Sequence, residues 1–327
     1  MIRMPGQSHQ GPLPPLTDEQ RRLEQELHSH VQMLAGQIGE RNVFHHDRLV
    51  MAANYIRATL AGAGYEVRLQ PYEVAGKICE NIEAEVRGGK RPDDIIVIGA
   101  HYDSVQGSPG ANDNASGVAA TLALARAFAE ATPARTLRFV SFANEEPPLF
   151  QTEHMGSRVY AMRSRERGEN IILMLSLETI GYYSDEPGSQ HLPFPLNLIY
   201  PSTGNFIAFV SNVENGSLVR QLVGSFRQQA QFPSEGGALW DLIPGVGWSD
   251  HWAFWKEGYP AVMVTDTAPF RYPAYHLPAD RPELVQYERM VRVVSGLRAV
   301  IAEMANAPRS PLSPPLRPNV TQNGRPG

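Results

Sequence analysis

The chain has 327 residues, a formal net charge of −5 and 42% hydrophobic residues, which is an ordinary globular composition. The charge is mildly acidic and no basic cluster stands out, so nucleic acid is not expected as a partner. The single cysteine, Cys79, excludes an intrachain disulfide framework. No apolar run reaches the length of a membrane span, and residues 1–20 lack the apolar segment of a signal peptide.

These features predict a cytoplasmic protein without a membrane span. An upstream start codon would add residues that could carry a signal, so secretion or a periplasmic location stays open. Residues 1–16 and residues 307–327 are rich in proline, glycine and polar residues, and this composition predicts two disordered tails. Residues 17–306 are predicted to form one folded domain.

Apolar periodicity and turn residues predict the elements between the tails. Helices are expected from Thr17 or Asp18 to about 34 and from about 46 to 63. Residues 182–246 are irregular and rich in Gly, Pro and aromatics, as is typical of pocket-forming loops. The remaining expectations are strands at 65–74, 81–86, 95–100, 137–143, 171–177, 196–200 and 261–265, and helices at 118–131, 155–163, 217–229 and 283–304.

The middle of the chain alternates buried strands with helices. Such alternation predicts an α/β fold in three layers, with a central twisted mixed, mostly parallel sheet flanked by helices. In open sheets of this kind, ligands bind beyond the carboxyl ends of the parallel strands. The residues that follow each buried strand are therefore the first place to look for a functional site.

Acidic residues and histidines follow three consecutive buried strands, and a further histidine lies in a loop past a later strand. Carboxylates brought together at one sheet edge repel each other and raise each other's pKa, and one or two divalent cations would stabilise them. Imidazole nitrogen mixed with carboxylate oxygen suits zinc, with manganese or cobalt as other metals that accept such ligands. The set is His101, Asp113, Glu145, Glu146, Glu178 and His276.

The motifs around these residues resemble the M28 zinc peptidases, which include bacterial leucyl-type aminopeptidases and share their fold with glutaminyl cyclases. The motifs are GAHYDS at 99–104, GANDNASG at 110–117, NEE at 144–146, SDH at 249–251 and YHLPAD at 275–280. The resemblance covers roughly residues 81–304. It implies that the predicted domain is catalytic, with a zinc-dependent exopeptidase-like fold.

The resemblance also implies a role for each metal ligand. His101 matches the first ligand of one metal, and Asp113 matches the carboxylate that bridges two metals. Glu146 and His276 match ligands of the second metal. Glu178 stands where the family usually has an Asp beside the first metal. Glutamate is one methylene longer than aspartate, so the first metal would be bound differently here.

Other residues match supporting roles in the same family pattern. Glu145 matches the general base, which takes a proton from metal-activated water. Asp103 matches the acid that orients His101, as ligating imidazoles generally require. Asp250 is interpreted as a supporting residue at a helix start, and Asp280 as a support for His276 or a cap of the last helix. The family pattern also includes a cis peptide after the bridging aspartate.

The predicted function is a two-zinc hydrolase, an aminopeptidase that removes N-terminal residues from a peptide or small amide with a free N-terminus. One alternative is a one-zinc glutaminyl cyclase-like acyltransferase, and another is a non-catalytic homologue. Residues 147–154 form a short insertion relative to the family pattern. We expect this insertion to lie at the pocket rim and to shape substrate access.

Overall fold

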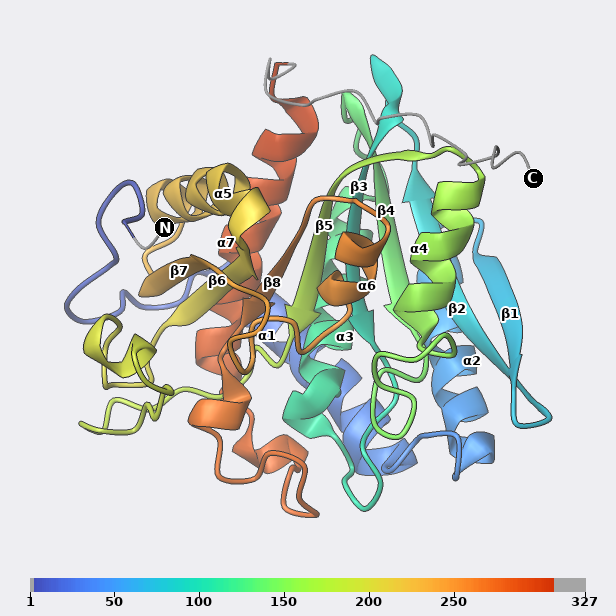
Figure 1. The fold of residues 1–327 in the computed structure, drawn as a ribbon, viewed down its shortest axis with the longest axis horizontal. Coiled ribbons are helices and arrows are strands. Elements are labelled where there is room, and N and C mark those ends of the chain that lie inside the picture. Colours follow the sequence, from blue (N-terminus) through green and yellow to red (C-terminus); the bar gives the residue numbers. More distant parts are fainter. Residues whose placement is uncertain (1–2, 309–327) are drawn as a thin grey trace, which may run out of the picture.

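The computed structural model describes residues 3–308, so nearly all of the predicted C-terminal tail lies outside the described residues. Figure 1 shows an α/β fold in three layers, and eight strands form one sheet in the order β1-β2-β4-β3-β5-β8-β6-β7. The predicted fold class is confirmed. The strands are β1 (Arg68–Val74), β2 (Lys77–Val86), β3 (Arg91–His101), β4 (Arg135–Phe142), β5 (Asn170–Glu178), β6 (Ile207–Asn212), β7 (Ser234–Leu239) and β8 (Ala261–Thr265).

The centre of the sheet is parallel and its margins are mixed. Strand β3 pairs in parallel with β4 and β5, and β5 pairs in parallel with β8. Antiparallel pairs join β1 to β2, β2 to β4 and β6 to β8, while β7 pairs in parallel with β6. Because β3, β4 and β5 run in the same direction, the residues that follow them meet at one edge of the sheet.

Helices cover both faces of the sheet, and Figure 1 shows α4 and α6 in front of it and α3 behind. The larger core lies on the side of α3, and a smaller core lies beneath α4 and α6. No helix within residues 3–308 is long and apolar enough to cross a membrane. The helices are α1 (Asp18–Val31), α2 (His46–Gly62), α3 (Gly117–Phe128), α4 (Gly156–Glu166), α5 (Gly216–Gln229), α6 (His251–Lys256) and α7 (Tyr287–Asn306).

The predicted elements from 46 to 177 agree with the structure to within a few residues, whereas the following segment differs. The strand predicted at 196–200 is a short 3₁₀ turn, Leu196–Leu198. Pro193 and Pro195 precede it, and proline disfavours pairing within a sheet. Strands β6 and β7 were not predicted. They are short, and β7 contains two glycines, which weakens any alternating pattern.

Residues 3–8 lie along α5 and β7, although the composition of residues 1–16 predicted disorder. The Ser234 amide donates a hydrogen bond of 2.8 Å to Ser8 Oγ, and Arg227 donates to the carbonyl of Gly6 at 3.1 Å. Met4 packs over Gly236 of β7. These contacts tie the segment to the edge strand of the sheet, and its apolar side chains supply the burial that composition alone did not reveal.

Candidate metal centre

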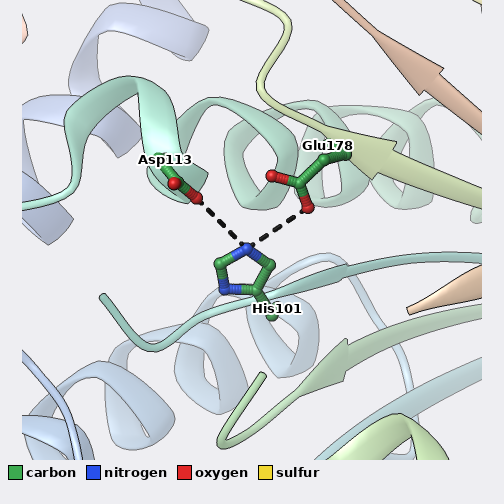
Figure 2. A group of neighbouring side chains, drawn as sticks. All are labelled: His101, Asp113 and Glu178. Carbon is green, nitrogen blue, oxygen red and sulfur yellow. Dashed lines mark ion pairs between the residues drawn. The ribbon is translucent and has the colours of Figure 1, made fainter. Parts of the chain in front are cut away.

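His101, Asp113 and Glu178 converge from three elements of the fold. His101 ends β3, Asp113 lies in the turn that precedes α3, and Glu178 ends β5. The Nε2 atom of His101 lies 3.3 Å from Asp113 Oδ1 and 3.3 Å from Glu178 Oε2, as Figure 2 shows. The predicted convergence of these side chains at one sheet edge is therefore present in the structure.

A second group shares Asp113 with the first. The Nε2 atom of His276 lies 3.1 Å from Asp113 Oδ2 and 3.3 Å from Glu146 Oε2. Asp113 therefore presents Oδ1 to His101 and Oδ2 to His276. In each group the three candidate ligand atoms lie within 4.8 Å of one another, which is the spacing of residues that surround one ion.

The spacing of these atoms fits zinc. Zn–N and Zn–O bonds of about 2.0–2.2 Å place neighbouring ligand atoms of a tetrahedron about 3.3–3.6 Å apart. The four distances given above run from 3.1 to 3.3 Å. Both ring nitrogens of His101 are buried and lack a hydrogen-bond partner among the described residues. Since buried polar groups are normally satisfied, a cation at this position would account for the unpaired nitrogen.

Burial and mutual repulsion shape the electrostatics of the centre. Burial raises the pKa of Glu146 and Glu178, and the nearby Asp113 charge adds to the rise for both. Burial would also raise the pKa of Asp113, yet the adjacent imidazoles of His101 and His276 bring that pKa below its usual range. Carboxylates packed this closely with two imidazoles need more positive charge than the imidazoles alone provide.

Glu145 lies beside the first group. Its Oε2 atom is 3.8 Å from His101 Nε2, and within the described chain its carboxylate accepts no hydrogen bond. A third grouping of candidate ligands, His101 with Glu145 and Glu146, is also within reach of one ion. Burial raises the pKa of Glu145 well above its ordinary value. Glu145 thus lies close to the candidate ligands, and its raised pKa makes its carboxylate a stronger proton acceptor.

Asp103 occupies the position expected of the acid behind His101. Its two carboxylate oxygens accept hydrogen bonds from the amides of Glu145 and Glu146, at 3.0 and 3.1 Å. Its Oδ1 atom also lies 3.4 Å from His101 Nδ1. One carboxylate therefore contacts the imidazole and fixes the backbone of the two adjacent glutamates.

Asp280 holds the turn that carries Asp113, which corrects the prediction that it supports His276 or caps the last helix. Its carboxylate accepts hydrogen bonds from the amides of Asn112 (2.8 Å) and Asp113 (3.0 Å) and from the Tyr272 hydroxyl (2.8 Å). The last helix begins after Gln286 instead. The Asp113–Asn114 peptide in this turn is cis, as the family pattern implied.

Asp250 and His251 lie at the start of α6, behind the centre. Asp250 is fully buried, and burial raises its pKa to about 7. His251 Nε2 donates to the carbonyl of Val246 at 2.8 Å, and burial lowers its pKa to about 4. His251 belongs to none of the three groups of candidate ligands. The neighbouring Ser249 donates to Glu178 Oε2 at 2.7 Å and so orients that carboxylate.

One supporting residue, Arg41, was not predicted from the sequence. Its guanidinium is buried and donates to the carbonyls of Tyr102 (2.7 Å), Pro109 (2.6 Å) and Gly110 (2.9 Å), among others. These contacts fix the loop between β3 and Asp113. Burial lowers the pKa of Arg41 to about 10, while nearby acids, Asp103 first, raise it.

Left-handed backbone conformations occur next to the candidate ligands. Asn144, which precedes Glu145, has φ 59°, and Thr179, which follows Glu178, has φ 46°. His276 itself has φ 58°. Such conformations cost of order 1–3 kcal/mol each for residues other than glycine, and they cluster at functional sites. The fold thus holds strained backbone at three points around the centre.

An apolar pocket opens beside Glu178 and Tyr275. Its volume is about 720 Å³, part of it open to solvent, and it lies over β6, β7 and β8. Trp248 forms part of its wall. The insertion at 147–154 contacts the residue next to this wall, because Gln151 donates to the carbonyl of Gly247 at 3.1 Å. The expected place of the insertion at the rim thus agrees with its contacts.

Comparison with known proteins identifies the family. The model of peptidase family M28 matches residues 81–301, about two thirds of the chain. The chain belongs to peptidase family M28. A relative of this M28 chain is the uncharacterized protein YfbL of Escherichia coli, 37% identical over 84% of this chain and 86% of that one. A probable zinc metalloprotease of Pyricularia oryzae is 35% identical over 41% of this chain and 28% of that protein.

Solved structures share the fold of the M28 chain. The aminopeptidase from Aneurinibacillus sp. strain AM-1 has a TM-score of 0.67 at 18% identity, over 88% of this chain and 95% of that one. A glutaminyl cyclase from Fimbriiglobus ruber has a TM-score of 0.64 at 20% identity, over 90% and 97%. At these identities the likeness concerns the fold alone. The two neighbours are named for different reactions, so the fold does not decide between those reactions.

Proposed function

We propose that this chain is a two-zinc aminopeptidase. The observation that carries the proposal is the position of Asp113, whose two oxygens face the two histidines of separate ligand groups. His101 and Glu178 would hold one ion with Asp113, and His276 and Glu146 would hold the other. Relatives named as zinc metalloproteases and fold neighbours named as zinc aminopeptidases support both the metal and the reaction.

The residues present divide the chemistry among them. A bound zinc ion lowers the pKa of a coordinated water and polarises a carbonyl oxygen. Glu145 lies close enough to accept a proton from water as the water oxygen adds to the substrate carbonyl carbon. As the C–N bond breaks, Glu145 returns that proton to the departing amine, so no proton is lost or gained overall. Asp103 keeps Glu145 in place by binding its amide.

The substrate would be a peptide or small amide with a free N-terminus. The apolar pocket begins at Glu178, a candidate ligand, so it is placed to receive the side chain of the residue whose carbonyl reacts. The loops that line the pocket belong to the irregular part of the sequence, where such binding surfaces usually reside. This arrangement supports the proposed removal of single N-terminal residues.

The central test is Glu145→Gln, which keeps the shape of the side chain and removes its ability to take a proton. We expect kcat on aminoacyl anilides to fall by about 10²–10⁴-fold, with zinc content unchanged at two per chain by elemental mass spectrometry. Glu130→Gln, at an exposed position after α3 and outside the pocket, is the matched control and should keep full activity. Full activity of a folded Glu145→Gln variant would refute the proposed mechanism.

The fold alone does not separate hydrolysis from glutaminyl cyclisation. A peptide that begins with glutamine separates them, because cyclisation releases ammonia and leaves the peptide bonds intact. Release of free glutamine is the expected result for an aminopeptidase. Ammonia release with one zinc per chain would support the cyclase reaction instead, and a protein that binds no zinc would be a non-catalytic homologue.

A further inference from the structure

We propose that Glu235 makes the pocket selective for substrates whose N-terminal side chain ends in a cation, that is, for lysine or arginine. This inference rests on the proposed aminopeptidase function and names its substrate class. Glu235 lies on β7 and lines the apolar pocket that begins at Glu178. The carboxylate would bind the ammonium or guanidinium group, and the pocket walls would contact the methylene stem.

Strand pairing places Glu235 in line with the metal centre. Glu178 of β5 is the cross-strand partner of Thr265 of β8, and Thr265 is the partner of Ala208 of β6. Ala208 in turn is the partner of Glu235 of β7. The four residues form one row across four neighbouring strands. Three strand spacings of about 4.8 Å separate the backbones of the two glutamates by about 14 Å.

The row forms the floor of an open passage because the side chains between the two glutamates are small. Ala208 and Thr265 both line the pocket. In the next row Gly237 leaves room for Tyr200, whose hydroxyl would lie 2.8 Å from a Cβ atom at that glycine. Tyr200 is fixed by a hydrogen bond of 2.9 Å to the carbonyl of Gly236. An elongated side chain can therefore lie along the floor from the metal centre toward Glu235.

The carboxylate of Glu235 lacks a full set of partners. Its side chain is 24% exposed, and it accepts no hydrogen bond from any residue in the described range. Arg227 lies 3.6 Å from its Oε2 atom. The Arg227 nitrogens donate hydrogen bonds to Ser234 and to the carbonyls of Pro5 and Gly6, so Arg227 forms an ion pair with Glu235 without a hydrogen bond to it.

Burial makes the charged form of Glu235 less favourable in this position, and a cationic ligand would offset that loss of solvation. Burial raises the pKa of Glu235, while the Arg227 charge works in the opposite direction. Apolar walls beside the Glu235 carboxylate suit a side chain with an apolar stem and a charged tip. A hydrogen bond between ionised groups is roughly twice as strong as one between neutral groups, so the tip would discriminate between substrates.

The test compares lysine with norleucine, which has nearly the same stem and lacks the ammonium group. We would measure kcat/KM of the zinc-loaded protein on the lysyl and norleucyl p-nitroanilides. The wild-type protein should prefer the lysyl substrate by about tenfold or more. Glu235→Gln should lower kcat/KM for the lysyl substrate by about 10- to 100-fold and leave the norleucyl value within about threefold.

Two further variants test whether the effect of Glu235→Gln arises from a general change of the structure. Glu214→Gln, at an exposed position on the same half of the molecule, should change neither value. Ala208→Val should narrow the passage and lower kcat/KM for both long substrates relative to an alanyl substrate. An alanyl value that stays normal would show that the variant is folded and that its centre is intact.

The results of these measurements distinguish a failure of the role proposed for Glu235 from a failure of the proposed aminopeptidase function. A wild-type preference for norleucine, or an equal loss on both substrates in Glu235→Gln, would overturn the inference and leave the aminopeptidase in place. An equal loss would assign Glu235 to holding Arg227 and β7. Failure of the zinc-loaded wild type to cleave any of the three substrates would overturn the proposed function together with this inference.

Discussion

Glu178 shows how one methylene group is accommodated at the candidate centre. The family usually has an aspartate here, and the longer glutamate reaches to 3.3 Å from His101 Nε2. Its Oε2 atom also accepts a hydrogen bond of 2.7 Å from Ser249, which in turn lies 2.9 Å from Ser176 Oγ. The surrounding hydroxyl groups are thus positioned for the longer side chain.

We therefore expect Glu178→Asp to weaken zinc binding even though it restores the usual family residue. The shorter side chain withdraws the carboxylate by about 1.5 Å, one C–C bond, from both Ser249 and His101. Loss of an orienting contact typically costs about 10- to 100-fold in metal affinity, and chelator competition would measure it. Glu178→Gln keeps the length of the side chain and therefore controls for the loss of charge. Unchanged zinc affinity in the Glu178→Asp variant would contradict this account.

Individual site residues were predicted from the sequence where a local pattern, such as the end of a buried strand, identified them. Residues at the ends of buried strands, such as His101 and Glu178, were identified because strand direction alone brings them together. Arg41 was not, since its contacts lie 61 to 69 positions along the chain and depend on burial. A buried arginine surrounded by carbonyls has no sequence pattern of its own.

At the scale of elements, a polar cluster joins α1 to α3. Arg126 of α3 donates to Glu26 of α1 at 2.6 Å through Nε and makes a second contact through Nη2. Burial would raise the pKa of Glu26, but the nearby His30 and the hydrogen-bonded Arg126 outweigh it and lower the pKa to about 2. The paired carboxylate is therefore favoured in the folded state.

The sign of this shift predicts how Glu26→Gln changes stability with pH. A depressed folded-state pKa contributes stability above the unfolded value of about 4.3, and the contribution disappears as pH falls through about 2. Since the pair is partly exposed, we expect Glu26→Gln to lower the unfolding free energy by about 1 kcal/mol at pH 7. Urea denaturation at several pH values, with Glu24→Gln as control, would measure this, and a difference independent of pH would contradict it.

Element-scale prediction failed at β6 and β7, and this failure hid the pocket. Strand β7, with the sequence SEGGAL, has neither the β-branched residues nor the alternation that identify a strand. Its place in the sheet is set by tertiary pairing with β6. Glu235 could not be identified as a pocket residue before the strand pairings were known, because only these pairings place it in one row with Glu178, Thr265 and Ala208.

At the scale of the whole molecule, the fold concentrates negative charge at the carboxyl edge of its parallel strands. The candidate ligands come from segments that are up to 175 residues apart, between His101 and His276. The folded chain therefore assembles a cluster that repels itself unless cations are bound, and the unfolded chain does not. Binding to the folded state alone must then stabilise the protein.

We expect zinc to raise the melting temperature of protein first stripped with a chelator. At a free zinc concentration of 100 times Kd, one site adds about 2.7 kcal/mol, which corresponds to about 4–5 °C for a domain of this size. Differential scanning calorimetry across zinc concentrations would measure the shift. Because Asp113 faces both ligand groups, Asp113→Asn should remove more of the shift than His101→Ala or His276→Ala. If all three variants lost the same part of the zinc-dependent rise in melting temperature, Asp113 would be a ligand of only one ion. That result would contradict its proposed role between two ions.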